Sequence, residues 1–230
     1  MSPSEEQARA ARQLMAAQLH GMLSTHSLEH PGYPFGSMVP YVLDYDGLPL
    51  FLLSHLSQHT RNLQQDARCG LMIAQQGAGD VQQLARLSAV GDVREIDAGS
   101  AGARYFRYFP QTRVYFEQLG FRFFRFEPLH FHWNGGFATA RWFGNDRIVR
   151  ANPFGAATEA STIEALTMQP PAWLQTHLNE RRPATASGRP TIVGIDAEGI
   201  DVRSADDLMR IALAHRVETL DELRTLSSAE

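Results

Sequence analysis

Residues 36–63 follow a pattern of strand, tight turn, strand and helix, which constrains the fold more than any other stretch of the chain. Segments 36–44 and 49–54 are mostly apolar, and Asp46-Gly47 between them tolerates the positive φ values that hairpin turns need. A short helix is predicted over 57–66, directly after the second strand. We therefore predict a β-hairpin that is followed, at Ser54, by a helix.

The first turn of this helix carries groups that can hold a phosphate. Free backbone N–H groups and the positive end of the helix dipole both favour an anion there. Thr60, Arg61 and Asn62 add side-chain donors, and the planar fork of Arg61 can bind two phosphate oxygens. The alternatives are a solvated arginine on the helix face for Arg61, a helix cap for Thr60 and a strand edge for Ser54.

Composition excludes or disfavours several classes of protein. The net charge of -4 and the pI of about 6.1 disfavour a nucleic-acid-binding protein. Cys69 is the only cysteine, so the chain has no internal disulfide and no thiolate metal cluster, and an apolar run surrounds it. The N-terminal residues lack the order of a signal peptide, and no apolar run reaches the ~20 residues of a membrane span. We expect a cytoplasmic protein without a membrane segment.

The first 150 residues read as one β-rich domain. A capping box, Ser4-x-x-Gln7, opens a helix predicted to about residue 19, and a second helix is predicted over 98–109. Alternating or apolar runs predict further strands over 21–25, 70–75, 86–96, 121–133 and 137–143. Many short strands with few helices indicate an α+β fold with a β-barrel, and the absence of a βαβα order argues against a doubly wound nucleotide-binding fold.

The composition changes near residue 152, and 158–230 is predicted to form a second, small α/β domain. Helices are expected over 161–166 and 171–178, and the basic, proline-containing stretch 181–190 is expected to be a loop. Three short strands follow over 191–196, 200–204 and 208–213. A second capping box, Thr219-x-x-Glu222, opens a terminal helix.

Several motifs, in a shared order over residues 8–143, resemble one known family. They are Gly32-Tyr33-Pro34-Phe35-Gly36-Ser37-Met38-Val39-Pro40-Tyr41, Leu53-Ser54, His59-Thr60-Arg61-Asn62-Leu63, Arg86-Leu87-Ser88, Arg104-Tyr105-Phe106, Phe123-Phe124-Arg125-Phe126-Glu127 and Gly135-Gly136-Phe137-Ala138-Thr139-Ala140. The pattern resembles the FMN-binding split barrel of the pyridoxamine 5′-phosphate oxidase-like superfamily, and within it the haem-utilisation (HugZ-like) branch. The resemblance implies a split β-barrel followed by that branch's C-terminal domain.

The tail also resembles that C-terminal domain of unknown function. His177-Leu178-Asn179 is similar to its His-Met-Asn opening, and Val193-Gly194-Ile195-Asp196-Ala197-Glu198-Gly199-Ile200-Asp201-Val202 is similar to its central hairpin. One position departs from the family pattern, because Arg182 stands where a second histidine usually follows. Any role of that histidine toward haem or a metal is therefore not expected here.

The resemblance implies an FMN that lies across a homodimer interface. Its ring would contact the strand residues Ser37, Met38, Val39 and Pro40, and its phosphate would be held by Ser54, Thr60, Arg61 and Asn62. Arg86 and Trp133 stand where the oxidases place flavin-flanking residues. Tyr41 replaces the lysine of those oxidases at the end of the strand, so pyridoxamine phosphate oxidation is not expected.

Nine histidines raise the question of a metal or a haem. The spacings His26-x-x-x-His30 and His55-x-x-x-His59 suit a metal only on a helix, and no carboxylate completes either pair, so no metal site is predicted. His26, His30, His177 and His215 remain candidate haem ligands, while His130 and His132 read as partly exposed strand residues. No side chain is predicted as a catalytic acid or base.

The predicted function is an FMN-dependent oxidoreductase of the haem-utilisation type that acts on a small-molecule ligand, in haem binding or degradation. Two alternatives stay open. One is a non-catalytic haem-binding or trafficking protein that has lost the flavin, and the other is a structural dimer that binds neither.

Overall fold

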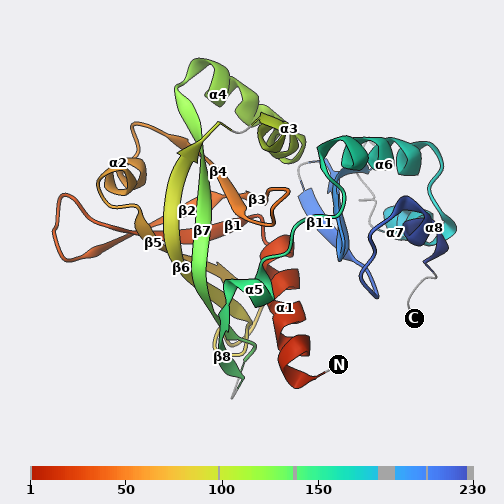
Figure 1. Ribbon diagram of the computed structural model, residues 1–230, viewed down its shortest axis with the longest axis horizontal. Helices are drawn as coiled ribbons and strands as arrows, with labels where there is room; N and C mark the ends of the chain where they lie inside the picture. The colour runs from red at the N-terminus through yellow and green to blue at the C-terminus, as the bar shows by residue number, and fades with distance from the viewer. Residues whose placement is uncertain (1, 98, 137–138, 181–189, 206, 227–230) are drawn as a thin grey trace.

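The computed structural model describes residues 2–97, 99–136, 139–180, 190–205 and 207–226. They form a mixed α+β fold with a curled, eight-stranded antiparallel sheet and a separate three-stranded antiparallel sheet (Figure 1). The helices are α1 (Pro3–Ala17), α2 (Gln58–Gln65), α3 (Gly99–Tyr108), the 3-10 turn η1 (Pro110–Thr112), α4 (Arg113–Gln118), α5 (Asn145–Ile148), α6 (Ala156–Met168), α7 (Ala172–Glu180) and α8 (Leu220–Thr225). The strands are β1 (His20–His26), β2 (Pro34–Pro40), β3 (Val42–Leu43), β4 (Pro49–Ser54), β5 (Arg68–Ala74), β6 (Arg86–Ile96), β7 (Phe121–Asn134), β8 (Ala140–Gly144), β9 (Thr191–Asp196), β10 (Gly199–Ser204) and β11 (Asp207–Ala212).

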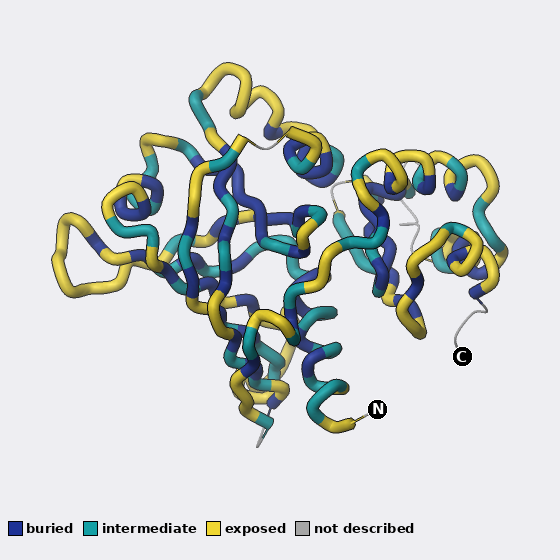
Figure 2. The backbone as a smooth tube through the Cα atoms, in the orientation of Figure 1, coloured by how far each residue is buried: buried dark blue, intermediate teal, exposed yellow. Residues whose placement is uncertain are grey.

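The large sheet has the strand order β2-β1-β5-β6-β7-β4-β3, and β8 pairs with β7. Its inner face is apolar and buried, as the side chains of Leu23, Leu71, Leu87 and Phe131 show. Buried residues lie along the strands in the middle of the large sheet (Figure 2). Alternate residues of each strand point to the other face, because the side-chain period of a strand is two. The curled sheet matches the predicted split barrel.

Helix α1 packs against this inner face through Ala8, Ala11 and Met15. It begins two residues earlier than the sequence pattern indicated, since Ser2 is the N-cap and its Oγ accepts a hydrogen bond from the backbone of Glu5. The predicted Ser4 cap is therefore wrong, because Pro3 with its fixed φ already suits the first helical position. The helix also ends at Ala17 rather than at residue 19.

The predicted hairpin is correct at its turn and wrong in its first strand. Val42–Leu43 pairs with β4 across Asp46-Gly47, where Gly47 has a φ of +79°. Strand β2 instead pairs with β1 along its full length, from Pro34 to Pro40. The backbone N–H of Tyr41 donates to the carbonyl of Leu19 and so continues the pairing with the β1 side, and the chain changes partner strand at Val42, which lies opposite Leu50.

The second sheet has the order β11-β10-β9, and its three strands confirm the predicted ones within a residue or two. Helix α6 is longer than the predicted 161–166, and stretch 181–189 of the predicted loop lies outside the described residues. An apolar core forms between this sheet and helices α6, α7 and α8, and includes Ile195, Ile200, Trp173 and Leu223.

Buried polar contacts join the two sheets. The carboxylate of Glu159 on α6 is fully buried and forms ion pairs with Arg104 and Arg107 of α3. It also accepts hydrogen bonds from the Tyr45 hydroxyl, at 2.9 Å, and from the backbone N–H of Ile195, at 2.9 Å. Side chains on both sides of the predicted boundary thus share one polar cluster, and the division into domains 1–150 and 158–230 stays a prediction.

Candidate functional site

The first turn of α2 follows β4 after three residues and lacks a side-chain cap. Ser57 is the N-cap, but its Oγ donates to the carbonyl oxygen of Ser54, at 2.8 Å, and lies 2.8 Å from Oγ1 of Thr60. The backbone N–H groups of this turn therefore receive no side-chain acceptor, and an anion fits there. Thr60 is fully buried beneath the turn, with its hydroxyl engaged by Ser57.

Asn62 is fully buried and fastens α2 to the end of β1. Its Nδ2 donates to Oγ1 of Thr25, at 2.8 Å. Its Oδ1 accepts from the backbone N–H of Leu28, at 3.2 Å, and from Nε2 of Gln58, at 2.9 Å. Both ends of the amide are satisfied within the fold, so Asn62 orders the helix start rather than offering a free donor.

Arg61 is exposed beside the same turn. Its Nη2 donates to Oε1 of Gln58, the first residue of α2, at 2.5 Å. No carboxylate pairs with its guanidinium among the described residues. The chemistry of Arg61 and of the uncapped backbone thus fits the phosphate of FMN, whereas Thr60 and Asn62 are already engaged.

The other predicted flavin residues lie elsewhere on the sheet. Strand β2 is the edge strand of the path, with Met38 facing outward, Val39 buried in the core and Ser37 half-buried. Trp133 points into the core from β7, whereas Arg86 of the neighbouring β6 lies half-buried on the outer face. The ten predicted residues therefore occupy three places in one chain: the α2 start with Ser54, strand β2, and the end of the β6–β7 pair.

An outer-face patch, which we call the β6–β8 patch, was missed by the sequence reasoning. It consists of Val90, Leu129, His130, His132 and Trp142. The rings of His132 and Trp142, which lie opposite each other on β7 and β8, are 4.9 Å apart, and Trp142 is 62% exposed. Large exposed aromatic side chains on a sheet face mark interaction or ligand sites. The sequence indicated, by its alternation, that His130 and His132 share one strand face. That Trp142 lies opposite His132 is known only from the register of β7 and β8.

A cavity of about 220 Å³ lies beside β5 and β6 and is lined by Met72, Val81, Leu84 and Arg86, among others. The guanidinium of Arg86 has one long contact, of 3.5 Å, with the carbonyl of Leu84, and no carboxylate partner among the described residues. A cation at the rim of an apolar cavity suits an apolar ligand that carries a carboxylate or phosphate.

The remaining histidines do not form a metal centre in the part of the chain that the structure describes. Nδ1 of His55 lies 3.0 Å from the carbonyl of Gly120, and His59 is half-buried on α2, where burial lowers the pKa of its imidazole. His177 lies in α7 with Nδ1 2.8 Å from the carbonyl of Trp173, and His30 lies exposed between β1 and β2.

The fold and the match to a family model define the class of this protein. Residues 2–152 match the model described as "CREG, beta-barrel", and the chain belongs to that family. This confirms the resemblance to the FMN-binding split-barrel superfamily. None of the described helices is long and apolar enough to cross a membrane.

Particular relatives carry more specific names. The chain is 34% identical over 144 residues to the non-canonical haem oxygenase HOZ of Arabidopsis thaliana chloroplasts, a match that covers 61% of this chain and 42% of that protein. The matched part is thus less than half of the curated relative. The structure is similar to that of Atu2129 from Agrobacterium tumefaciens, a protein of unknown function, with a TM-score of 0.75, 28% identity and 96% and 95% of the two chains covered. It also shares the fold of a haem-binding protein from Mycobacterium smegmatis, with a TM-score of 0.59, 24% identity and 97% and 94% covered.

Proposed function

We propose that this protein binds haem on the β6–β8 patch. The observation that carries the proposal is the His132 ring packed against the exposed Trp142 on the outer face of the sheet. The haem oxygenase named among its relatives, 34% identical over the matched segment, supports the same ligand. The fold shared with the haem-binding protein from Mycobacterium smegmatis supports the fold of this chain and not its ligand.

The chemistry of the patch suits that ligand. Haem has an apolar macrocycle, an iron that accepts imidazole nitrogen, and two carboxylates. Trp142 and Val90 offer exposed apolar surface, and His130 and His132 offer imidazoles on the same face of β7. Arg86 lies on the same face, because it precedes Ser88 by two residues on β6 and Ser88 lies opposite His132. Its guanidinium can bind a haem propionate.

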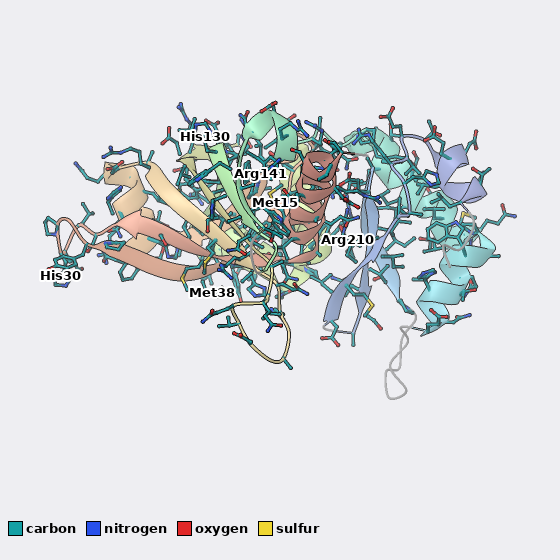
Figure 3. All side chains as sticks on the ribbon, turned by 90° about the horizontal axis from the view of Figure 1, so that it is seen from below. Met15, His30, Met38, His130, Arg141 and Arg210 are labelled. Carbon is teal, nitrogen blue, oxygen red and sulfur yellow. The ribbon has the colours of Figure 1, made fainter. Side chains whose placement is uncertain are left out.

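A haemin titration of the full chain, followed by its Soret band, tests this proposal. We expect saturable binding that His132→Ala and Trp142→Ala each weaken. His30→Ala is the matched control, because His30 lies at the far tip of the β1–β2 connection, away from His130 (Figure 3). Circular dichroism of each variant checks its fold. Equal haem affinity of the wild type and the Trp142→Ala variant, or no saturable binding at all, would refute the proposal.

FMN is the second candidate ligand, supported by the uncapped first turn of α2 with the exposed Arg61 beside it. When bound, FMN supplies hydride or electron transfer, and the protein supplies binding and orientation. Because the ten predicted residues lie in three places, a flavin that touches all of them needs two subunits. Denaturing the purified protein and identifying the released chromophore by mass and absorbance tests this candidate, and release of no flavin from protein grown with excess riboflavin contradicts it.

We also propose a homodimer, because a flavin that touches all ten predicted residues needs two subunits. Light scattering on the eluting protein gives the mass directly, and a monomer at micromolar concentration would contradict the dimer. The cytoplasmic location stays part of this proposal.

A further inference from the structure

Three methionines form a row across neighbouring strands of the large sheet. Met22 of β1 lies directly opposite Met38 of β2 on one side and opposite Met72 of β5 on the other. Residues in register on paired strands point to the same face, with Cβ atoms about 4.5–5.5 Å apart. All three side chains therefore project from the outer face, and Met38 and Met72 are 62% and 41% exposed.

The middle side chain lies along the surface of the sheet. A Cβ atom added to Gly36, which precedes Met38 by two residues on the same face, would come within 3.1 Å of the sulfur of Met22. Because Gly36 has no side chain, the thioether of Met22 can lie against its backbone on the outer face. Methionine has three rotatable bonds, so the outer two thioethers can turn toward the middle one.

An imidazole lies at the same place. His20 precedes Met22 by two residues on β1, and so shares its face. Nε2 of His20 is 3.0 Å from Nε2 of the Gln76 amide, which has two N–H groups to donate. The lone pair of His20 Nε2 accepts that hydrogen bond, and the same lone pair can bind a metal ion instead.

The surroundings of this cluster select for a soft ion. The neighbours of the row on these strands are Gly36, Ser24 and Gly70 on one side, and Pro40, His20 and Ala74 on the other, with no carboxylate among them. Hard divalent cations prefer carboxylate and carbonyl oxygen, whereas thioether sulfur selects Cu(I) and the chemically similar Ag(I). On β6, Ser88 lies opposite both Met72 and His132, and Arg86 lines the 220 Å³ cavity together with Met72, so the row adjoins the β6–β8 patch across one strand, whereas Met38 at its other end lies well apart from His130 in Figure 3.

We propose that Met22, Met38 and Met72, together with His20, form a binding site for a soft monovalent metal ion, Cu(I) or Ag(I). Neutral thioether and imidazole ligands bind such an ion without a change in its oxidation state. Met38 is also a predicted flavin contact, and one strand separates Met72 from His132 of the proposed haem patch, so the metal titration uses protein free of flavin and haem.

Competition with a chromophoric Cu(I) chelator tests the site. The full chain is titrated anaerobically with Cu(I) and excess reductant, and we expect it to withdraw one equivalent from the chelator. Met→Leu is nearly isosteric, so Met22→Leu and Met38→Leu keep the fold while removing the sulfur. We expect each to weaken Cu(I) binding by more than about tenfold, and Met168→Leu, 79% exposed in α6, to leave it unchanged.

A second measurement on the wild-type protein does not depend on the variants. Addition of Ag(I) to protein labelled at the methionine methyl groups should shift the signals of Met22, Met38 and Met72 and leave those of Met15 and Met168 in place. Chelator competition that is identical in the wild type and the Met22→Leu, Met38→Leu double variant would overturn the site. So would Ag(I) shifts spread equally over all methionines.

Discussion

The hydroxyl of Tyr108 on α3 donates a 2.6 Å hydrogen bond to Oδ2 of Asp201 on β10. Both groups are buried, and the bond connects a helix that packs on the large sheet with the central strand of the small one. Gly194 on β9 makes the approach possible, because a Cβ atom there would collide with the Tyr108 hydroxyl. The small sheet is thus held at α3 by polar contacts as well as by apolar packing.

Tyr108→Phe is expected to destabilise the protein by about 1–3 kcal/mol, because it leaves a buried carboxylate oxygen of Asp201 without its donor. Chemical denaturation measures the loss. Tyr115→Phe is the control, since Tyr115 is 37% exposed on α4. A Tyr108→Phe variant as stable as the control would show that water replaces the hydroxyl at no cost.

Glu159→Gln is expected to cost about 3–5 kcal/mol, because it removes the negative charge from the buried cluster and leaves Arg104 uncompensated. The measurement is again the free energy of unfolding. Glu164→Gln, an exposed change on the same helix, should alter it by less than about 0.5 kcal/mol. Similar losses in both variants would contradict the importance of the buried pair.

Arg61→Ala is expected to weaken FMN binding by about 1.5–3 kcal/mol if its guanidinium holds the phosphate. Quenching of flavin fluorescence during a titration gives the affinity. Arg68→Ala removes the same charge from an exposed position on β5 and should leave the affinity unchanged. Equal affinity of the wild type and the Arg61→Ala variant would place the phosphate elsewhere.

Stability should fall as the solution becomes more acidic than about pH 6.5, in part through His59. Burial lowers the pKa of His59 in the folded protein, so the unfolded chain binds more protons as the pH drops from 6.5 toward the folded value. The His59→Gln variant should therefore lose less of its melting temperature between about pH 7.5 and 5.5 than the wild type does. His30→Gln is the exposed control. If the melting temperature of the His59→Gln variant falls as much between these two pH values as that of the wild type, other groups account for the acid effect.

Local patterns in the sequence predicted most of the elements and failed where a partner strand had to be chosen. Strand 86–96 and the turn at Asp46-Gly47 are encoded by alternation and by turn chemistry, both of which act over a few residues. The pairing of β2 with β1 rather than β4 is set by the register of residues 34–40 on residues 20–26, and the alternation within a strand does not determine that register. Periodicity carries no record of which strand lies alongside.

The candidate site divides in the same way. The sequence alone identified Arg61 at a helix start and the two imidazoles of His130 and His132 on one strand face. Asn62 was predicted as a ligand donor, but its amide is engaged by Thr25, which lies 37 residues earlier. Only the folded chain reveals that a polar group is already satisfied, because its partners come from distant segments.

The sequence by itself determined the class of fold, the family and the order of the strands along the chain, because apolar periodicity and turn residues act locally. Tertiary structure decided which side chains meet: the contact of His132 with Trp142, the row of Met38, Met22 and Met72, and the burial of Glu159 against α3 and β9. The first two depend on strand register, since a shift of one residue would send those side chains to the opposite face, and the third depends on the packing of α6 against α3 and β9.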